Sequence, residues 1–472
     1  MMLVNLAMLM PANRLVRSPV PVCCAPGMDP KIALFSELLS SAPNAAVELA
    51  PASSDSGGVA LVATQDVSAG DVLLTVPKKM LVTAHRSGVL SGLQGQTEAT
   101  WDAAGDLRKE VGEEMFERGA TWDVRLALGV FEACAGSGGI FWDKYRRLLP
   151  APPKLAHPLT LPDAMLDELQ DDEMADKTRQ LREKLRALYP DLATHSVHPA
   201  TAGYERMGAP MDQIPLPLPY AYALVVSRCF TMSDGDTFAF VPFLDMADHA
   251  AQPSANFASD ARGFVLKSLR PIAMGEEVSI CYGEEYTTRR LFEQYGFAPA
   301  EGTAADAQML RDVVAAARAD KSSGVALAFS EGPSTPLGQS QAALQALGAA
   351  FQELADSPWS TSERRGAIFD ALTGQEEVPT TEGGTEGEEG EGGGGTPAIP
   401  AIDGLPPSAL LMAVRWQLNQ FPTSLEQDEA LREQLTEQAS GDVRPIAVIN
   451  YRIARKRLLE LTQSILSTFL GL

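Results

Sequence analysis

The sequence is short of basic residues. It contains 38 lysines and arginines against 61 aspartates and glutamates, which gives a formal net charge of −23 at pH 7. A field of that sign repels phosphate groups, so nucleic acids and anionic membrane surfaces are unfavourable partners. No apolar run reaches the roughly 18 residues that a membrane-spanning helix needs. We therefore predict a protein that binds neither nucleic acid nor membrane.

Cysteine and histidine are also scarce, with five of each. The cysteine number is odd, the spacings are wide and no Cys-x-x-Cys pair occurs, so neither a disulfide framework nor a structural zinc site is expected. One histidine, His249, directly follows Asp248 and lies close to Asp245. These three side chains could face one metal ion, but no further histidine or carboxylate cluster completes the site, and we predict no metal.

The remaining composition is that of a globular protein. The chain has 472 residues with 45% apolar and 21% charged residues, which predicts two or three domains. Residues 1–28 include Arg14 and Arg17 but no acidic residue. No basic region precedes the apolar stretch Met1–Met10, which argues against a secretory signal. Two interpretations stay open for residues 1–28, an organelle transit peptide or a disordered leader.

The first half of the chain alternates strand-like and helical patterns. The segment "GVALVATQDVSAGDVLLTVP" predicts a hairpin of strands 59–64 and 71–76. Helical spacing follows at 122–134 and again at 163–188, where Leu181, Leu185 and Leu188 form a stripe. The all-apolar segment "YAYALVVSRCF" predicts a buried helix that ends in the charge of Arg228. Strands are expected again from residue 238, at 264–267 and at 277–282.

From about residue 305 onward the pattern is helical. Residues 374–395 hold seven glutamates, many glycines and no basic residue. Such a segment cannot bury enough apolar surface to become ordered, so we predict a disordered acidic loop at 374–404. In the last segment, Pro445 suits a first helical turn, and apolar residues recur on one helical face. These residues are Ala447, Tyr451, Ala454, Leu458, Leu461 and Ile465. An all-helical C-terminal domain is predicted.

Five segments occur in an order that is similar to a known family. They are "GVALVATQDVSAGDVLLTVP", "SRCF", "FVPFLDMADH", "GEEVSICYGEEYTTRRLFEQYGF" and "FPTSLEQDEALREQL". Together they resemble the SET-domain methyltransferases of the Rubisco large-subunit methyltransferase class. The resemblance implies an α+β fold: a SET domain at 50–300, built of short β-sheets with a pseudoknot and a helical insert at about 100–220. A helical substrate-binding domain at 305–472 is expected to follow.

The resemblance also implies the cofactor S-adenosyl-L-methionine. The stretch around Asp248 and His249 matches the family's Asn-His motif, with aspartate in place of the usual asparagine. Arg228 stands where the family holds the cofactor's carboxylate. The first strand matches the family's G-x-G segment, with alanine in place of the second glycine. By resemblance, these cofactor contacts come from Gly58, Ala60, Leu61, Arg228, Asp248 and His249.

A central tyrosine is the catalytic residue that the resemblance implies. Tyr282 follows the alternating "EEVSI" and precedes Gly283, so it is expected at the end of a strand, where its hydroxyl would orient the substrate amine. Phe230 resembles the aromatic residue of the lysine-directed branch, whereas the histidine-directed branch carries a polar residue there. The expected substrate channel consists of Phe230, Met232, Phe257 and Tyr295.

The expected activity is therefore methyl transfer to a lysine of a non-histone protein. In histone-directed SET enzymes a cysteine cluster follows the segment that corresponds to "EQYGF" here. This chain has no such cluster. Met232 replaces an arginine of the plant Rubisco enzymes, which argues against Rubisco itself as the target. The expected partner is a protein, either Rubisco or another plastid or cytosolic protein. A chloroplast location is expected from the acid-free leader, with the cytoplasm as the alternative. A protein-histidine methyltransferase and a non-catalytic scaffold with a SET fold are the alternative functions.

Overall fold

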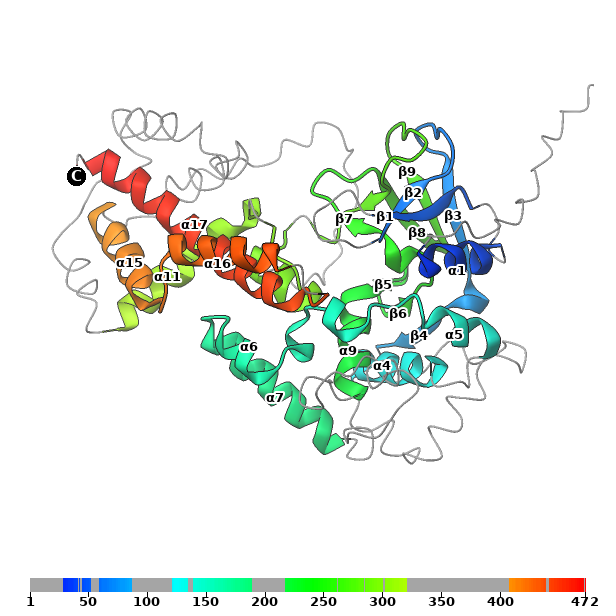
Figure 1. Ribbon diagram of the computed structural model, residues 1–472, viewed down its shortest axis with the longest axis horizontal. Helices are drawn as coiled ribbons and strands as arrows, with labels where there is room; N and C mark the ends of the chain where they lie inside the picture. Colours follow the sequence, from blue (N-terminus) through cyan, green and yellow to red (C-terminus); the bar gives the residue numbers. More distant parts are fainter. Residues whose placement is uncertain are drawn as a thin grey trace, which may run out of the picture.

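Short β-sheets and a group of C-terminal helices occupy opposite ends of the computed structural model (Figure 1). The structure describes residues 29–40, 42, 45–51, 59–86, 121–134, 139–188, 217–260, 262–283, 285–299, 302–320, 407–438, 441–470 and 472. Helix α1 (Pro30–Leu39) accompanies the sheets. The C-terminal helices are α11 (Ala307–Ala319), α15 (Pro407–Gln420), α16 (Leu425–Glu437) and α17 (Arg444–Leu470). This arrangement confirms the predicted α+β class.

The described strands form four small sheets. Two strands, β1 (Val47–Pro51) and β2 (Val59–Ala63), pair antiparallel. A second sheet has the order β3 (Val72–Pro77), β9 (Gly263–Ser268) and β8 (Ala255–Asp260). A third has the order β4 (Val82–His85), β6 (Thr237–Phe240) and β5 (Cys229–Thr231). The fourth joins the two-residue strands β7 (Asp248–His249) and β10 (Ser279–Ile280) in parallel. Strands distant in sequence therefore meet in three of the four sheets.

The predicted hairpin of strands 59–64 and 71–76 is wrong in its pairing. Both strands exist, but β2 pairs with β1, and β3 pairs with β9. The connection between them instead contacts a distant segment, because Val67 pairs with Ile272 and the Gly70 amide donates to the Ser268 carbonyl over 2.9 Å. Alternation in the sequence marks a half-buried strand, but it carries no information about which strand is its neighbour.

The helices of the central part are α4 (Trp122–Glu132), α5 (Gly139–Tyr145), α6 (Asp163–Asp167), α7 (Asp172–Leu188) and α9 (Pro217–Arg228). In the view of Figure 1, α4, α5 and α9 lie below the sheets, and α6 and α7 lie below the C-terminal helices. Single-turn 3-10 helices lie at Lys78–Met80, Pro152–Lys154, Pro158–Thr160 and Ala304–Asp306. The helical pattern predicted over 163–188 is interrupted at Gln170, whose φ of 53° ends one helix before the next begins. Helix α9 ends at Arg228 as predicted.

Helix α10 (Thr288–Tyr295) is fixed at both ends. Thr287 accepts from the Arg290 amide at its start, and Gly296 takes a left-handed conformation (φ 79°) at its end. A Cβ atom on Gly296 would lie 2.6 Å from backbone atoms of Ala156 and His157. Only glycine permits this close approach, which seats the helix against the central part of the chain.

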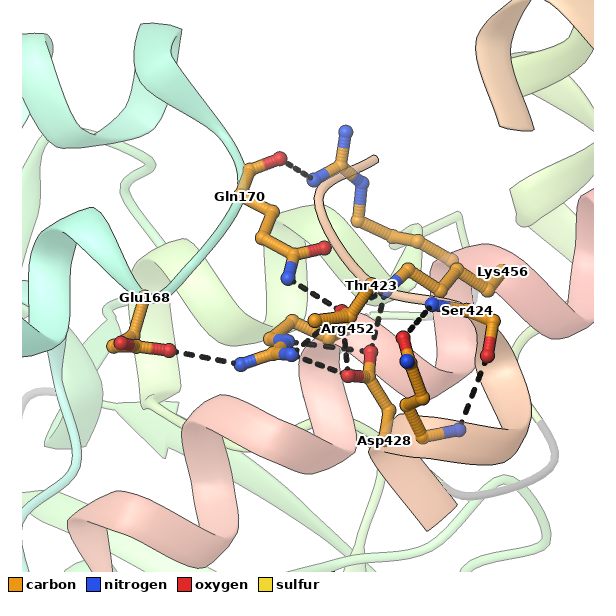
Figure 2. Close-up of polar contacts among 9 residues, drawn as sticks. Glu168, Gln170, Thr423, Ser424, Asp428, Arg452 and Lys456 are labelled. Carbon is orange, nitrogen blue, oxygen red and sulfur yellow. Dashed lines mark hydrogen bonds and ion pairs between the residues drawn. The ribbon is translucent and has the colours of Figure 1, made fainter. Parts of the chain in front are cut away.

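A buried ionic network joins α16 and α17 to the segment between α6 and α7 (Figure 2). Asp428 accepts from Lys456 at 2.5 Å and from Arg452 Nε at 3.2 Å. Arg452 Nη1 also lies 3.0 Å from Glu168 Oε2. The Gln170 amide donates to the Thr423 hydroxyl over 2.7 Å. These contacts tie the C-terminal helices to the rest of the molecule.

The network explains why the segment "TSLEQDEAL" does more than cap a helix. Ser424 caps α16 in a capping box, with Gln427 as its partner. Asp428 lies in the first turn of the same helix, but its side chain is fully buried. The expectation of one apolar face on α17 is incomplete for the same reason, because Arg452 and Lys456 are as buried as Tyr451. Charges that neutralise each other can be buried on a helix without appearing in an apolar pattern.

Several predictions fall on residues outside those described. They concern the leader 1–28, Gly58, and the acidic loop 374–404. The boundaries of the three domains and the pseudoknot stay predictions. No helix within the described ranges is long and apolar enough to cross a bilayer. In that same part of the chain, no three His, Cys, Asp or Glu side chains gather as metal ligands would.

Candidate active site

The parallel pair β7–β10 brings together two motifs that are about thirty residues apart. Asp248 lies opposite Ser279, and His249 lies opposite Ile280. The Val278 amide donates to the Leu61 carbonyl over 2.7 Å, which attaches β2 to the same place. The segments that carry Leu61, His249 and Tyr282 therefore meet through backbone hydrogen bonds. Arg228, on the fourth predicted segment, is described below.

Tyr282 is fixed at both its backbone and its hydroxyl. Its amide donates to His249 Nδ1 over 3.1 Å, and its hydroxyl donates to the Ala247 carbonyl over 2.9 Å. Because Nδ1 accepts this bond, the neutral imidazole carries its proton on Nε2. Burial lowers the pKa of His249, which favours this neutral form.

The phenol of Tyr282 stays protonated. Burial raises its pKa well above the ordinary value, and the carboxylate of Asp248 acts in the same direction. A hydroxyl that donates to a carbonyl keeps its oxygen lone pairs for another donor. Tyr282 can therefore accept a hydrogen bond from an amine, but it is not suited to act as a tyrosinate base.

Arg228 reaches the same site from the end of α9. Its Nη1 donates to the Asp245 carbonyl oxygen over 2.5 Å and lies 3.6 Å from Asp245 Oδ2. The Asp245 side chain is fully buried, whereas 23% of the Arg228 side chain is exposed. Within the described part of the chain, Arg228 Nε has no hydrogen-bond partner. Nη1 is thus held by Asp245, Nε is buried, and the exposed part of the side chain is what an anion could approach.

Asp248 is exposed as a residue, yet protein atoms crowd its carboxyl group. This desolvation raises the pKa to about 6, while Arg228 lowers it and Glu277 raises it further. The carboxylate is close enough to Tyr282 to affect the pKa of that phenol. Asp248, Tyr282 and Arg228 consequently share one electrostatic environment.

Aromatic rings line the neighbourhood in two groups. Phe230 packs edge-on against Phe257, with ring centroids 4.9 Å apart. Tyr295, at the end of α10, lies 4.5 Å from Tyr282 between ring centroids. The Met232 backbone closes the turn between β5 and β6, where its amide donates to Thr237. The structure thus brings Tyr295 into contact with Tyr282, places Phe230 and Phe257 together, and puts Met232 at a strand end.

The first strand contributes its backbone. Ala60 and Leu61 lie in β2 and are buried, with exposed fractions of 2% and 0%. The strand geometry of Ala60 is one that any residue can adopt, so the methyl group introduces no left-handed strain. Gly58, at the end of the matched segment, precedes the described part of this strand.

Two participants were not predicted from the sequence. Phe297 contacts the rings of His249, Tyr282 and Tyr295. It directly follows the "YG" of the quoted segment, a position that could have pointed to it. Tyr145, from the helical insert, binds Asp245, and no local pattern distinguishes it from the other tyrosines.

Comparison with known proteins agrees with this arrangement. Residues 58–283 match the family model described as "SET domain". That range includes Arg228, Asp248, His249 and Tyr282. Residues 58–283 are a SET domain. Tyr295 and Phe297 lie just beyond the matched range of the SET domain.

Among curated proteins, the chain is similar to the N-lysine methyltransferase SETD6 of Mus musculus. The two are 23% identical over 302 residues, which cover 61% of this chain and 59% of SETD6. The match therefore spans less than two thirds of that relative.

The chain is also similar to two solved structures. The SET domain of LSMT bound to methyllysine and AdoHcy has a TM-score of 0.50 and 18% identity, covering 93% of this chain and 92% of that chain. Rubisco LSMT bound to AdoMet has a TM-score of 0.49 and 19% identity, covering the same shares. The first of these two similarities shows a shared fold and nothing beyond the fold.

Proposed function

We propose that this protein transfers a methyl group from S-adenosyl-L-methionine to a lysine side chain of a non-histone protein. The observation that carries the proposal is the placement of Tyr282 within the SET domain. Its hydroxyl is held by the Ala247 carbonyl, next to the neutral ring of His249 and near Arg228. The curated relative is an N-lysine methyltransferase, which supports lysine as the acceptor.

The residues at the site fit a zwitterionic cofactor. The partly exposed positive side chain of Arg228 suits a carboxylate. Above pH 6 the ionised Asp248 suits an ammonium group, and the Nε2–H of His249 and the Leu61 strand complete the set of contacts. Bound there, S-adenosyl-L-methionine supplies an electrophilic methyl group. Ala60, Leu61, Arg228, Asp248 and His249 would hold it, with Gly58 at the start of the strand.

Tyr282 has the role of orienting the acceptor amine. Its oxygen can accept an N–H from the amine, because its own proton is committed to Ala247. An apolar channel favours the neutral amine over the ammonium, since burial lowers the pKa of a lysine. Phe230 and Phe257 offer an apolar wall for the alkyl chain, with Tyr295 beside Tyr282. Catalysis then consists mainly of positioning and water exclusion.

The substrate protein is proposed to be Rubisco or another plastid or cytosolic protein. The non-histone class rests on the absence of a cysteine cluster after the Tyr295 segment in the sequence. A chloroplast location is proposed from the acid-free residues 1–28, with the cytoplasm as the alternative.

The direct test is incubation of the purified protein with isotope-labelled S-adenosyl-L-methionine and a fractionated plant-type or cytosolic extract. We expect label on lysine in one or a few proteins, identified by mass spectrometry. Tyr282→Phe should lower kcat by about 10² or more, with a nearly unchanged cofactor Kd, because only the amine-orienting hydroxyl is lost.

Tyr222→Phe is the matched control for this substitution. Tyr222 also donates a side-chain hydrogen bond, to Asp123 over 2.5 Å, but this bond joins α9 to α4 and does not involve Tyr282. Its activity should equal that of the wild type. Label on histidine would replace the lysine assignment by histidine methylation. A protein that binds no S-adenosyl-L-methionine at micromolar concentrations would be a scaffold, and the proposal would be wrong.

A further inference from the structure

A continuous chain of hydrogen bonds runs behind the candidate active site. The Phe243 amide donates to the Tyr145 hydroxyl over 2.6 Å, and that hydroxyl donates to Asp245 Oδ1. An amide N–H can only donate, so the tyrosine proton must point toward Asp245. The direction of the chain is thereby fixed, from the backbone through Tyr145 to the carboxylate.

The bond from Tyr145 decides how Asp245 faces Arg228. It occupies Oδ1, which leaves Oδ2 as the oxygen nearest to Arg228, 3.6 Å from Nη1. Arg228 Nη1 is additionally bound to the carbonyl oxygen of Asp245 over 2.5 Å. Both the side chain and the backbone of Asp245 therefore restrain the guanidinium. Oδ2 has no hydrogen-bond partner within the described part of the chain, so the ion pair is its only close polar contact there.

The turn that carries Asp245 is held in an unusual conformation. Phe243 has a φ of 71°, a value that bulky residues rarely adopt and that requires support from the surroundings. Its ring is packed edge-on against Phe35 and Tyr145, with centroids 5.4 and 5.6 Å away. Tyr145 therefore supports this turn twice, through its ring and through its hydroxyl.

We propose that Tyr145 is a positioning residue for cofactor binding, which acts on Arg228 through Asp245. This proposal rests on the proposed function, because Arg228 is the residue assigned to the cofactor's carboxylate. The hydroxyl of Tyr145 orients the Asp245 carboxylate. That carboxylate and the Asp245 carbonyl restrain Nη1 of the guanidinium, while 23% of the Arg228 side chain stays exposed for the cofactor's carboxylate. Tyr145 does not touch the reacting atoms.

The test compares two buried tyrosines that have the same chemistry. Tyr145 donates to the buried Asp245, and Asp245 forms an ion pair with Arg228. In the same way, Tyr451 donates over 2.6 Å to the buried Asp171, and Asp171 forms an ion pair with Arg289. Tyr145→Phe and Tyr451→Phe each remove one such hydroxyl. The Kd for S-adenosylhomocysteine is measured by titration calorimetry on full-length protein. We expect about tenfold weaker binding for Tyr145→Phe, and a change within about twofold for Tyr451→Phe.

A double-mutant cycle with Arg228→Lys identifies the path of the effect. If Tyr145 acts through Arg228, adding Tyr145→Phe to Arg228→Lys should change the Kd by less than about twofold. In turnover assays, Tyr145→Phe should raise the KM for the cofactor and leave kcat at saturating cofactor nearly unchanged. Equal Kd values for Tyr145→Phe and the wild type, or full additivity in the cycle, would overturn the proposal.

Asp245→Asn keeps the test decisive if Tyr145→Phe does not fold. The amide retains the shape and an oxygen for Tyr145 but removes the charge that faces Arg228. We expect weaker S-adenosylhomocysteine binding here too, and unchanged binding would overturn the proposal. Failure of the wild type to bind would instead refute the proposed function. Binding by the wild type with no effect of these substitutions would refute only the role of Tyr145.

Discussion

At the scale of a single residue, Asp245 must be buried and must also carry a charge that faces Arg228. Its carboxyl group is fully buried, and this burial raises its pKa to about 6. Arg228 and the hydrogen bond from Tyr145 act in the opposite direction but do not restore the ordinary value. Above pH 6 the side chain is charged and can restrain Arg228, at a cost to the stability of the fold.

The pH dependence of stability should reveal that cost. Because the pKa is higher in the folded than in the unfolded protein, the folded state binds more protons between about pH 4 and 6. Stability from this group is therefore fully present at low pH and falls as pH rises toward 6. We expect the unfolding free energy of Asp245→Asn minus that of the wild type to increase by up to about 3 kcal/mol over this window.

Urea denaturation at half-unit pH steps measures this difference. Between about pH 7 and 8 the difference should stay nearly constant, because Asp245 is then almost fully ionised in both states. Asp248 also has a raised pKa, of about 6, but it is present in both proteins and its contribution cancels in the difference. A difference that does not vary between pH 4 and 6 would show that Asp245 is ionised in the folded protein throughout.

At the scale of an element, α10 shows how one glycine positions an aromatic group. The helix delivers Tyr295 to Tyr282, and Gly296 then turns the chain so that Phe297 contacts His249. The turn requires φ 79° and an approach to the backbone of Ala156 and His157. The end of α10 therefore packs directly against the Ala156–His157 backbone.

Substitution of Gly296 by alanine tests that seating. The Cβ would meet backbone atoms at 2.6 Å, in addition to the strain of a positive φ. We expect a loss of about 3 kcal/mol in the free energy of unfolding. Gly275 is the matched control, because its φ is 81° and no atom lies within 4 Å of its Cβ position. Gly275→Ala should cost only about 1 kcal/mol, and equal losses would exclude the packing explanation.

At the scale of the whole molecule, ionic and aromatic contacts join the sheet-rich region to the C-terminal helices. Phe292 of α10 stacks on Tyr451 of α17, with ring centroids 4.5 Å apart. The Asp428 network lies nearby, with Arg452 extending from it to Glu168 (Figure 2). Buried side chains therefore connect α10 and the segment between α6 and α7 to α16 and α17.

Asp428 and Glu168, the two carboxylates of this network, should contribute very differently to the free energy of unfolding. Asp428→Ala leaves Arg452 and Lys456 buried, with exposed fractions of 3% and 1%, and without their shared carboxylate. We expect the free energy of unfolding to fall by about 3–5 kcal/mol, with faster amide hydrogen exchange in α16 and α17. Glu168→Ala removes a carboxylate that is 65% exposed, and should cost less than about 1 kcal/mol. Similar losses in the two variants would contradict the assigned burial.

Local patterns predicted most elements because their physical causes are local. Helix α9 was predicted with its terminal Arg228, because the apolar run and its closing charge lie in one segment. Strand partners were not predictable: β3 turned out to pair with β9, because the partner depends on packing far along the chain. Asp428 lies in the first turn of α16, and only the approach of Arg452 and Lys456 shows it to be buried.

The sequence by itself predicted many of the elements and, through ordered motifs that resemble a SET domain, the residue types of the site, because periodicity and motifs are properties of neighbouring residues. The tertiary structure alone decided that Tyr145 of the insert supports Asp245 and Arg228, and that Phe297 joins His249 and Tyr282. The reason is physical: a side-chain hydroxyl or ring selects its partner by distance and burial in the folded chain. The separation of Tyr145 from Asp245 by 100 residues leaves no trace of that choice in the sequence.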